Sequence, residues 1–208
     1  MGTTDDLTLA IDAAHAAGAL LQAHWNDRDL LTIDAKRRGD FVSQADHQSE
    51  ALLRDRLLGA NPDDGWLGEE TDARPGRRRW IVDPLDGTTN FLRGIAHWAV
   101  SIALEQDGQL VLGVVHDPLK AETFSAMTGS GLQLNGRRLD PAAPPGFDAA
   151  LFGTGLPFGN MPYIDDHAAD LARVLPGTAG VRRMGAAALD LAYVAAGRLD
   201  GFWERRLR

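Results

Sequence analysis

A proline that follows an apolar run after a single acid, within residues 80–91 (WIVDPLDGTTNF), constrains this chain more than any other sequence feature. Trp80-Ile81-Val82 is typical of a buried strand, and Pro84 cannot donate the next backbone hydrogen bond of a sheet. We therefore expect the strand to end at Asp83. Gly87-Thr88-Thr89 then predicts a tight turn that opens a short helix. The acids of this motif and the first amides of the helix would face one point.

Two chemical interpretations of this motif stay open from its residues alone. Mg2+ prefers carboxylate, carbonyl and water oxygens, and the N-terminal amides of a helix attract phosphate oxygens, so Asp83 and Asp86 fit a metal-bridged phosphate. Without a cation, two carboxylates about 4 Å apart repel by roughly 4 kcal/mol at an effective dielectric constant near 20. Alternatively, the two acids only cap a turn, which is the usual role of an Asp-Pro-x-Asp-Gly segment.

The composition is that of a soluble globular protein. Its 208 residues are 44% hydrophobic and 24% charged, which suffices for one large core or two small lobes. The chain has no cysteine, which excludes disulfides and thiolate metal sites. A net charge of −8 argues against unspecific binding to nucleic acid or to an anionic membrane. Because no secretory leader and no apolar run of ~18 residues is present, we expect a cytoplasmic location.

Periodicity predicts two helices in the first part of the chain. Apolar residues recur at helical spacing from Leu7 to Trp25, and again in the run from Leu52 to Leu57. Ser43 and Asp46 form an S-x-x-D pattern ahead of the second helix, which is typical of a capping box. We expect Ser43 to serve as a cap only.

The middle of the chain predicts an antiparallel sheet. Residues 98–106 and 109–117 are β-rich and meet at Asp107-Gly108, a strong hairpin signal, and further strands are expected near 122–125 and 132–134. The proline-rich stretch 141–146 is the best internal boundary, so we predict an N-terminal lobe of residues 1–140 and a C-terminal lobe of residues 147–208. The second lobe is expected to contain a strand at 149–152, helices at about 163–175 and 186–196, and a strand at 199–203.

The central motif resembles the signature of the inositol monophosphatase family, which are Mg2+-dependent, lithium-sensitive phosphatases. The resemblance covers nearly the whole chain and rests on DFVSQAD (40–46), GEET (68–71), DPLDGTTNF (83–91), GAAALD (185–190) and DGFWE (200–204). It implies an α+β fold, a layered α-β sandwich of the inositol monophosphatase/fructose-1,6-bisphosphatase type. It also implies hydrolysis of a small-molecule phosphate monoester, first of all inositol monophosphate. Related enzymes act on fructose bisphosphate, histidinol phosphate or phosphoadenosine nucleotides, so the substrate stays open.

The resemblance implies roles for single residues. The implied Mg2+ ligands are Glu69, Asp83, Asp86 and the Leu85 carbonyl. Glu69, Thr88 and Asp46 are the implied catalytic residues, with Asp46 accepting a hydrogen bond from Thr88 so that the threonine orients the attacking water. Implied substrate contacts are the amides of Gly87 and Thr88, the turn Gly185, Ala186 and Ala187, and the acid Glu204. As bare residues, this last turn is a helix start and Glu204 a strand-end charge, and that alternative stays open.

Several other polar residues receive a plainer interpretation. The stretch 36–40 corresponds to a mobile loop near the metals in the family, with Lys36 as its cation, but a solvated turn is the default. Glu70 is at most an outer group of the site. Packing or surface roles are expected for His15, His24, His97 and His116, and a solvated basic end for Arg205, Arg206 and Arg208.

The sequence also departs from the family pattern. The family continues beyond the position of Arg208 with a Trp-Asp pair whose aspartate binds metal. We therefore expect an incomplete second lobe and a weakened second metal site. Dimers are common in the family, so a homodimer is compatible with the resemblance. The alternative of a different class is a non-catalytic interaction protein that retains the fold.

Overall fold

The computed structural model describes residues 3–27, 31, 33–37, 40–140, 143, 145–156 and 162–205, with only the backbone of 33–37 and 40–42. Its helices are α1 (Thr4–Asn26), α2 (Gln44–Ala60), α3 (Thr88–Leu92), α4 (Ile164–Val174) and α5 (Ala187–Ala195), with short 3-10 turns η2 (Phe147–Ala149) and η3 (Leu175–Gly177). Its strands are β1 (Ile33–Arg37), β2 (Asp40–Ser43), β3 (Gly65–Leu67), β4 (Arg78–Asp86), β5 (Ala99–Gln106), β6 (Gln109–Asp117), β7 (Glu122–Met127), β8 (Gly131–Leu134), β9 (Arg137–Arg138), β10 (Leu151–Thr154), β11 (Gly180–Arg182) and β12 (Gly201–Trp203).

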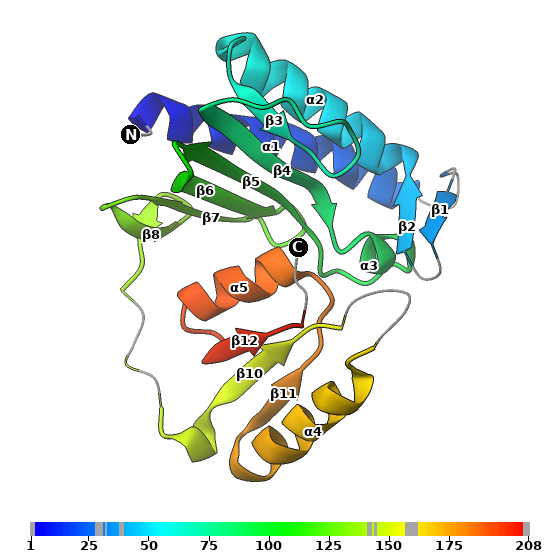
Figure 1. Cartoon of the computed structure of the whole chain (residues 1–208), viewed down its shortest axis with the longest axis vertical. Helices are drawn as coiled ribbons and strands as arrows, with labels where there is room; N and C mark the ends of the chain where they lie inside the picture. Colours follow the sequence, from blue (N-terminus) through cyan, green and yellow to red (C-terminus); the bar gives the residue numbers. More distant parts are fainter. Residues whose placement is uncertain are drawn as a thin grey trace.

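The elements stack in alternating helical and sheet layers, which confirms the predicted α+β arrangement. Helices α1 and α2 cover one face of a sheet with strand order β3-β4-β5-β6-β7-β8-β9, and α5 lies beyond its other face (Figure 1). That sheet is antiparallel except for the parallel pair β3 and β4. A second sheet, of parallel strands ordered β11-β10-β12, lies between α5 and α4 (Figure 1). The division of the chain into two independent lobes stays a prediction.

Strand β4 is longer than predicted, because it does not end at Asp83. Residues 78–83 pair with 101–106 of β5, and pairing resumes between Asp86 and Ala99 after an irregularity. Pro84 lies within that irregularity, where the ladder does not need its missing N–H. In a regular strand, residues three apart point to opposite faces of the sheet. The irregularity therefore allows the acids at both of its ends to face one side.

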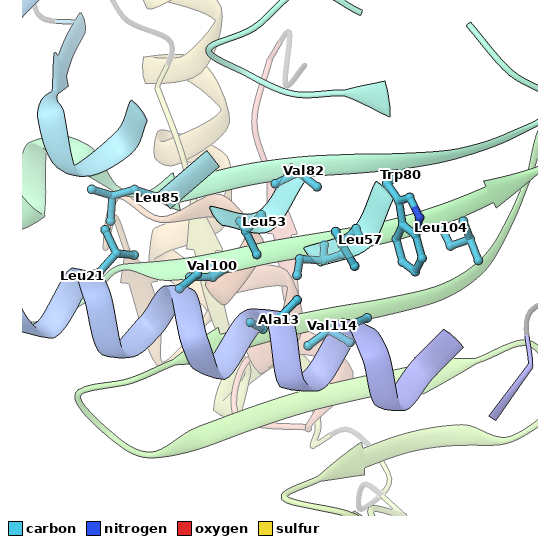
Figure 2. Close-up of a cluster of buried hydrophobic side chains, with 14 of the residues drawn as sticks. Ala13, Leu21, Leu53, Leu57, Trp80, Val82, Leu85, Val100, Leu104 and Val114 are labelled. Carbon is cyan, nitrogen blue, oxygen red and sulfur yellow. The ribbon is translucent and has the colours of Figure 1, made fainter. Parts of the chain in front are cut away.

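The main core fills the space between the first helical layer and the long sheet. Alanines 10, 13, 14 and 17 of α1 are buried and let this helix approach the sheet closely. Figure 2 shows the larger side chains that meet there, among them Leu21, Leu53, Leu57, Trp80, Val82, Leu85, Val100, Leu104 and Val114. The tryptophans of β3 and β4 are completely buried.

Polar ties connect the layers at their edges. Arg78 on β4 donates to Asp6, which also completes the N-terminal capping box of α1 with Thr3. Far along the chain, Arg198 donates to Glu122 of β7 at 2.7 Å, and its guanidinium lies 4.8 Å from the ring centre of Tyr193 on α5. This second tie fastens α5 to the long sheet.

In the C-terminal part, each predicted helix and strand is present, but one observed strand was not predicted. The strand expected at 149–152 occupies Leu151–Thr154, behind the turn Phe147–Ala149. Strand β11 was not predicted, because Gly180–Arg182 is too short to show an alternating pattern. Among the described residues, no helix combines the length and apolarity needed to cross a membrane.

Truncating the core should destabilise the protein far more than truncating its surface. Leu57 is fully buried, so Leu57→Ala is expected to lower the free energy of unfolding by about 2–5 kcal/mol through lost burial and a cavity. Leu110 is 63% exposed, and Leu110→Ala serves as the matched control with less than about 0.5 kcal/mol. Urea denaturation followed by circular dichroism measures both. Equal losses would contradict the assignment of the core.

Candidate functional site

A pocket of about 180 Å³ lies where the end of β4, the starts of α3 and α5, and the ends of β10 and β12 meet. Five acids line it: Glu69, Asp83, Asp86, Asp190 and Glu204. The other lining residues are Leu85, Gly87, Thr88, Thr89, Gly155, Leu156, Arg183, Gly185, Ala186 and Ala187. Every residue predicted for the site is therefore at this pocket except Asp46, which lies behind Thr88. Segments up to 135 residues apart in the sequence come together here, from Glu69 to Glu204.

Asp83 and Glu69 form one wall of the pocket. The Leu85 amide donates to Asp83 Oδ1 at 3.0 Å, and Asp83 also hydrogen-bonds Glu69. Burial raises the pKa of Asp83 well above its ordinary value, and the charges of Asp86 and Glu69 raise it further. A positive charge placed beside Asp83 would therefore stabilise this wall, because its neighbours Asp86 and Glu69 disfavour the charged form of Asp83.

Asp86 faces the N-terminus of α5. Its Oδ2 accepts a hydrogen bond from the Ala188 amide at 2.8 Å, and this bond joins the end of β4 to α5. Burial raises the pKa of Asp86 to about 7, although the amides of Ala188 and Leu189 favour the charged form and act against the increase. The charge of Asp190 adds to the increase. Asp86 is thus close to its titration point at neutral pH.

Thr88 connects the pocket to the buried Asp46. Its Oγ1 lies 3.0 Å from Asp46 Oδ1 and 3.0 Å from the Leu85 carbonyl oxygen. Either oxygen can accept a hydrogen bond from the Thr88 hydroxyl. Asp46 Oδ2 accepts the Ser43 amide at 2.9 Å, which completes the capping box of α2. The two interpretations of Asp46 are therefore compatible: one oxygen serves the cap and the other faces Thr88. Ser43 is found in the cap, as predicted.

Two glycine turns pack against each other at the floor of the pocket. Gly87 and Gly185 have φ values of 90° and 89°, a region in which residues with a side chain are strained. A Cβ on Gly87 would lie 3.1 Å from that of Ala186. Asn90 Nδ2 holds the second turn in place by donating to the Met184 carbonyl at 2.8 Å. The predicted substrate turn therefore lies beside the predicted phosphate turn.

Glu204 and Arg183 lie at another wall of the pocket. A Cβ on Gly155 would lie only 1.8 Å from Glu204 Oε2, so the missing side chain at residue 155 makes room for the carboxylate. Burial raises the pKa of Glu204, and the positive charge of Arg183 acts in the opposite direction. Arg183 was not predicted as a site residue. Its position two residues before the glycine of the substrate turn is the signal that could have indicated it.

Glu50 and Asp190 are buried acids that the sequence analysis also missed. Glu50 is completely buried on α2, and its Oε2 accepts the Glu70 amide at 2.7 Å while Thr71 Oγ1 donates to its other oxygen. It thus holds the two residues that directly follow Glu69. Its place on the buried face that also carries Leu53 and Leu57 was the available signal. Asp190 lies 3.1 Å from His97 Nε2, and no local sequence pattern indicates this pair.

The remaining predicted polar residues lie away from the pocket. His15 Nε2 and His116 Nδ1 both lie within 3.0 Å of Thr123 Oγ1, and His24 contacts Gln48. Arg205 donates to Asp170. The side chain of Lys36 and the residues Arg206 and Arg208 lie outside the described part of the chain.

The oxygen-only donor set fits a hard divalent cation such as Mg2+. Glu69, Asp83 and the Leu85 carbonyl would hold one ion, whose positive charge would offset the repulsion between the neighbouring acids. Asp86 would contribute the oxygen that does not face α5. Within the described ranges, no three His, Cys, Asp or Glu side chains are spaced as a preformed metal site. The site residues therefore fit the cation by chemistry but need small side-chain movements to enclose it.

Comparison with known proteins agrees with these features. The sequence profile of the inositol monophosphatase family matches residues 4–208. An inositol-1-monophosphatase of Rhizobium meliloti is 45% identical over 204 residues, which cover 97% of this chain and 77% of that protein. The Nus factor SuhB of Pseudomonas aeruginosa is 43% identical over 206 residues, covering 95% of this chain and 76% of that protein.

Solved structures show the same fold. The extragenic suppressor protein suhB of Bartonella henselae superposes with a TM-score of 0.93 at 43% identity, covering 97% of this chain and 78% of that one. An IMPase of Thermotoga maritima superposes with a TM-score of 0.89 at 32% identity, covering 98% and 78%.

Glu50 is expected to position Glu69. Glu50→Gln replaces one acceptor oxygen by an NH2 group, so one buried donor loses its partner and the free energy of unfolding should fall by about 1–3 kcal/mol. Mg2+ should also bind more weakly, which calorimetric titration measures. Asp55→Asn makes the same chemical change at an exposed position of α2 and is the control. If both variants bind Mg2+ alike, Glu50 has no positioning role.

Without divalent cations, stability should fall as pH rises. Because the pKa of Asp86 is raised from 3.8 to about 7 and that of Asp83 is raised too, the folded protein retains protons that the unfolded chain releases. The urea midpoint in EDTA is therefore expected to decrease between about pH 4 and pH 7. Asp86→Asn should remove part of this decrease, and Mg2+ should reverse it in the unmodified protein. A midpoint that rises across this range would contradict the raised pKa values.

Proposed function

Because the chain belongs to the inositol monophosphatase family, we propose that it hydrolyses a small-molecule phosphate monoester, in the first place inositol monophosphate, with Mg2+ as cofactor. The observation that carries this proposal is the convergence of Glu69, Asp83, Asp86 and Thr88 on one pocket. Acids that repel each other have a chemical use when a divalent cation and a phosphate join them. A cytoplasmic location and a homodimer stay predictions.

The acids supply the cation site. Glu69, Asp83 and the Leu85 carbonyl would hold one ion, and Asp83 and Asp86 would share or hold a second. Bound Mg2+ neutralises phosphate charge and lowers the pKa of the attacking water. In a pocket lined by five acids, a phosphate dianion would otherwise be repelled.

Thr88 and Asp46 orient the attacking water. The Thr88 hydroxyl donates its hydrogen bond to Asp46 or to the Leu85 carbonyl, so its oxygen lone pairs are left to accept a hydrogen bond from the water. That bond turns an oxygen lone pair of the water toward phosphorus. Asp46 is fixed by its two bonds to Ser43, so the orientation is set before substrate binds.

The two glycine turns bind the substrate itself. The amides of Gly87 and Thr88 open α3, where no preceding turn supplies carbonyls to accept them, and they donate to the phosphate oxygens. The alcohol part lies along Gly185, Ala186 and Ala187, and Glu204 accepts a hydrogen bond from one of its hydroxyl groups. Related phosphates of sugars, histidinol or nucleotides are alternative substrates of the same site.

Two neighbouring glutamates provide the sharpest test of this function. Glu69 lines the pocket, whereas Glu70 does not line it and donates a backbone hydrogen bond to Glu50. Glu69→Gln is expected to lower Mg2+-dependent phosphate release by about 10²-fold or more, because a ligand and its charge are lost. Glu70→Gln should leave release nearly unchanged. A substrate panel with phosphate detection measures both, and equal rates in the two variants would refute the assignment of Glu69.

A non-catalytic interaction protein is the second candidate function. Relatives named Nus factor SuhB, at 43% identity in Pseudomonas aeruginosa and 39% in Escherichia coli, favour it. A surface used for a partner does not need the pocket acids in their charged form. Asp86→Asn should therefore abolish phosphate release if the chain is a phosphatase, yet leave a partner contact intact if it is an interaction protein.

A further inference from the structure

We propose that Arg183 forms a subsite for a second acidic group, a carboxylate or a further phosphate, on the alcohol part of the substrate. This inference rests on the proposed phosphatase function and narrows its substrate class. The alcohol that leaves would then carry both a hydroxyl group and an acid.

The charge of the pocket lining is the first observation. Among its described lining residues, Arg183 is the one base beside five acids. The Mg2+ ions of the proposed function would compensate Glu69, Asp83 and Asp86. Near Glu204 the lining thus offers both an acceptor for hydroxyl groups and, in Arg183, a positive charge that acts on Glu204 without a hydrogen bond between them.

The second observation is that the guanidinium of Arg183 is available. Several other arginines of the described chain are held in ion pairs: Arg78 with Asp6, Arg79 with Glu105, Arg198 with Glu122, and Arg205 with Asp170. Arg183 forms no hydrogen bond or ion pair with any described residue, and its side chain is exposed at the pocket. A guanidinium carries five N–H donors, and this one belongs to a residue that lines the pocket.

The position of Arg183 separates it from the phosphate that is transferred. Its Nη1 lies 3.0 Å from where a Cβ of Gly185 would be, on the turn proposed to contact the alcohol. Its charge acts on the pKa of Glu204. Burial, backbone amides and neighbouring acids dominate the pKa values of Asp83 and Asp86 instead. Arg183 thus belongs to the alcohol end of the pocket.

The chemistry of the pair defines the ligand. A guanidinium binds a carboxylate or phosphate through two parallel hydrogen bonds, which a neutral hydroxyl cannot match. Glu204 meanwhile accepts from a hydroxyl group. A phosphorylated hydroxy acid or a sugar bisphosphate satisfies both residues, whereas a neutral polyol phosphate leaves Arg183 without its partner.

Two probes of nearly equal size test this subsite. 2-Phosphoglycerate differs from glycerol 2-phosphate by one carboxylate in place of one hydroxymethyl group. With the full chain and saturating Mg2+, kcat/KM should favour 2-phosphoglycerate. Arg183→Gln is expected to lower this preference about tenfold or more, mainly through KM, because a charge-assisted hydrogen bond is lost. Arg182→Gln is the matched control: its guanidinium contacts the Val181 carbonyl, and the preference should persist.

The outcomes separate this subsite from the phosphatase function. An equal loss for both probes would place Arg183 on the transferred phosphate and overturn the subsite, and so would an unchanged preference. If the unmodified chain releases phosphate from neither probe, calorimetric binding of the two probes with Mg2+ decides the subsite, whereas the phosphatase function itself fails only if inositol monophosphate and the rest of the substrate panel are not hydrolysed either. Tighter binding of 2-phosphoglycerate that Arg183→Gln abolishes would support the subsite, and equal binding would overturn it.

Discussion

The mutual repulsion of acids gathered at the end of β4 is the constraint on which the rest of the structure depends. Asp83 and Asp86 occupy the two ends of the irregularity around Pro84, where the strand loses its regular alternation. Their pKa values are raised because the charged carboxylates are unfavourable when they are buried beside other acids without a counter-charge. Such an arrangement persists only where the surrounding structure is stable by itself. The buried layer between α1, α2 and the long sheet provides that stability.

The elements around the acids limit this repulsion in different ways. The amide of Ala188 and the start of α5 act on Asp86, and the amide of Leu85 acts on Asp83. The buried carboxylate of Glu50 accepts a hydrogen bond from the amide of Glu70 and so holds the turn that carries Glu69. The site is therefore assembled by backbone amides and by one buried carboxylate rather than by ion pairs. This leaves the charges of the pocket acids available for a cation.

Much of the fold could be predicted from local patterns, because these patterns act over a few residues. The hairpin at Asp107-Gly108 has the positive φ values that its sequence predicts, and the capping box of Ser43 forms as expected. The continuation of β4 past Pro84 was not predicted, since it depends on pairing with Ala99. The site residues named from the family motif gather at one pocket. Asp190 was missed because its partner His97 lies far away in the sequence, and Arg183 was missed although it stands two residues before the glycine of the substrate turn.

The hydrogen bond from Ala188 to Asp86 has a thermodynamic consequence. A charged carboxylate accepts such a bond more strongly than a neutral one. Asp86 titrates near neutrality, so its ionisation and the attachment of α5 to the long sheet are coupled equilibria. Any cation that keeps this side chain negative therefore also strengthens the attachment of α5 to β4. Filling the pocket and docking this helix would then favour each other.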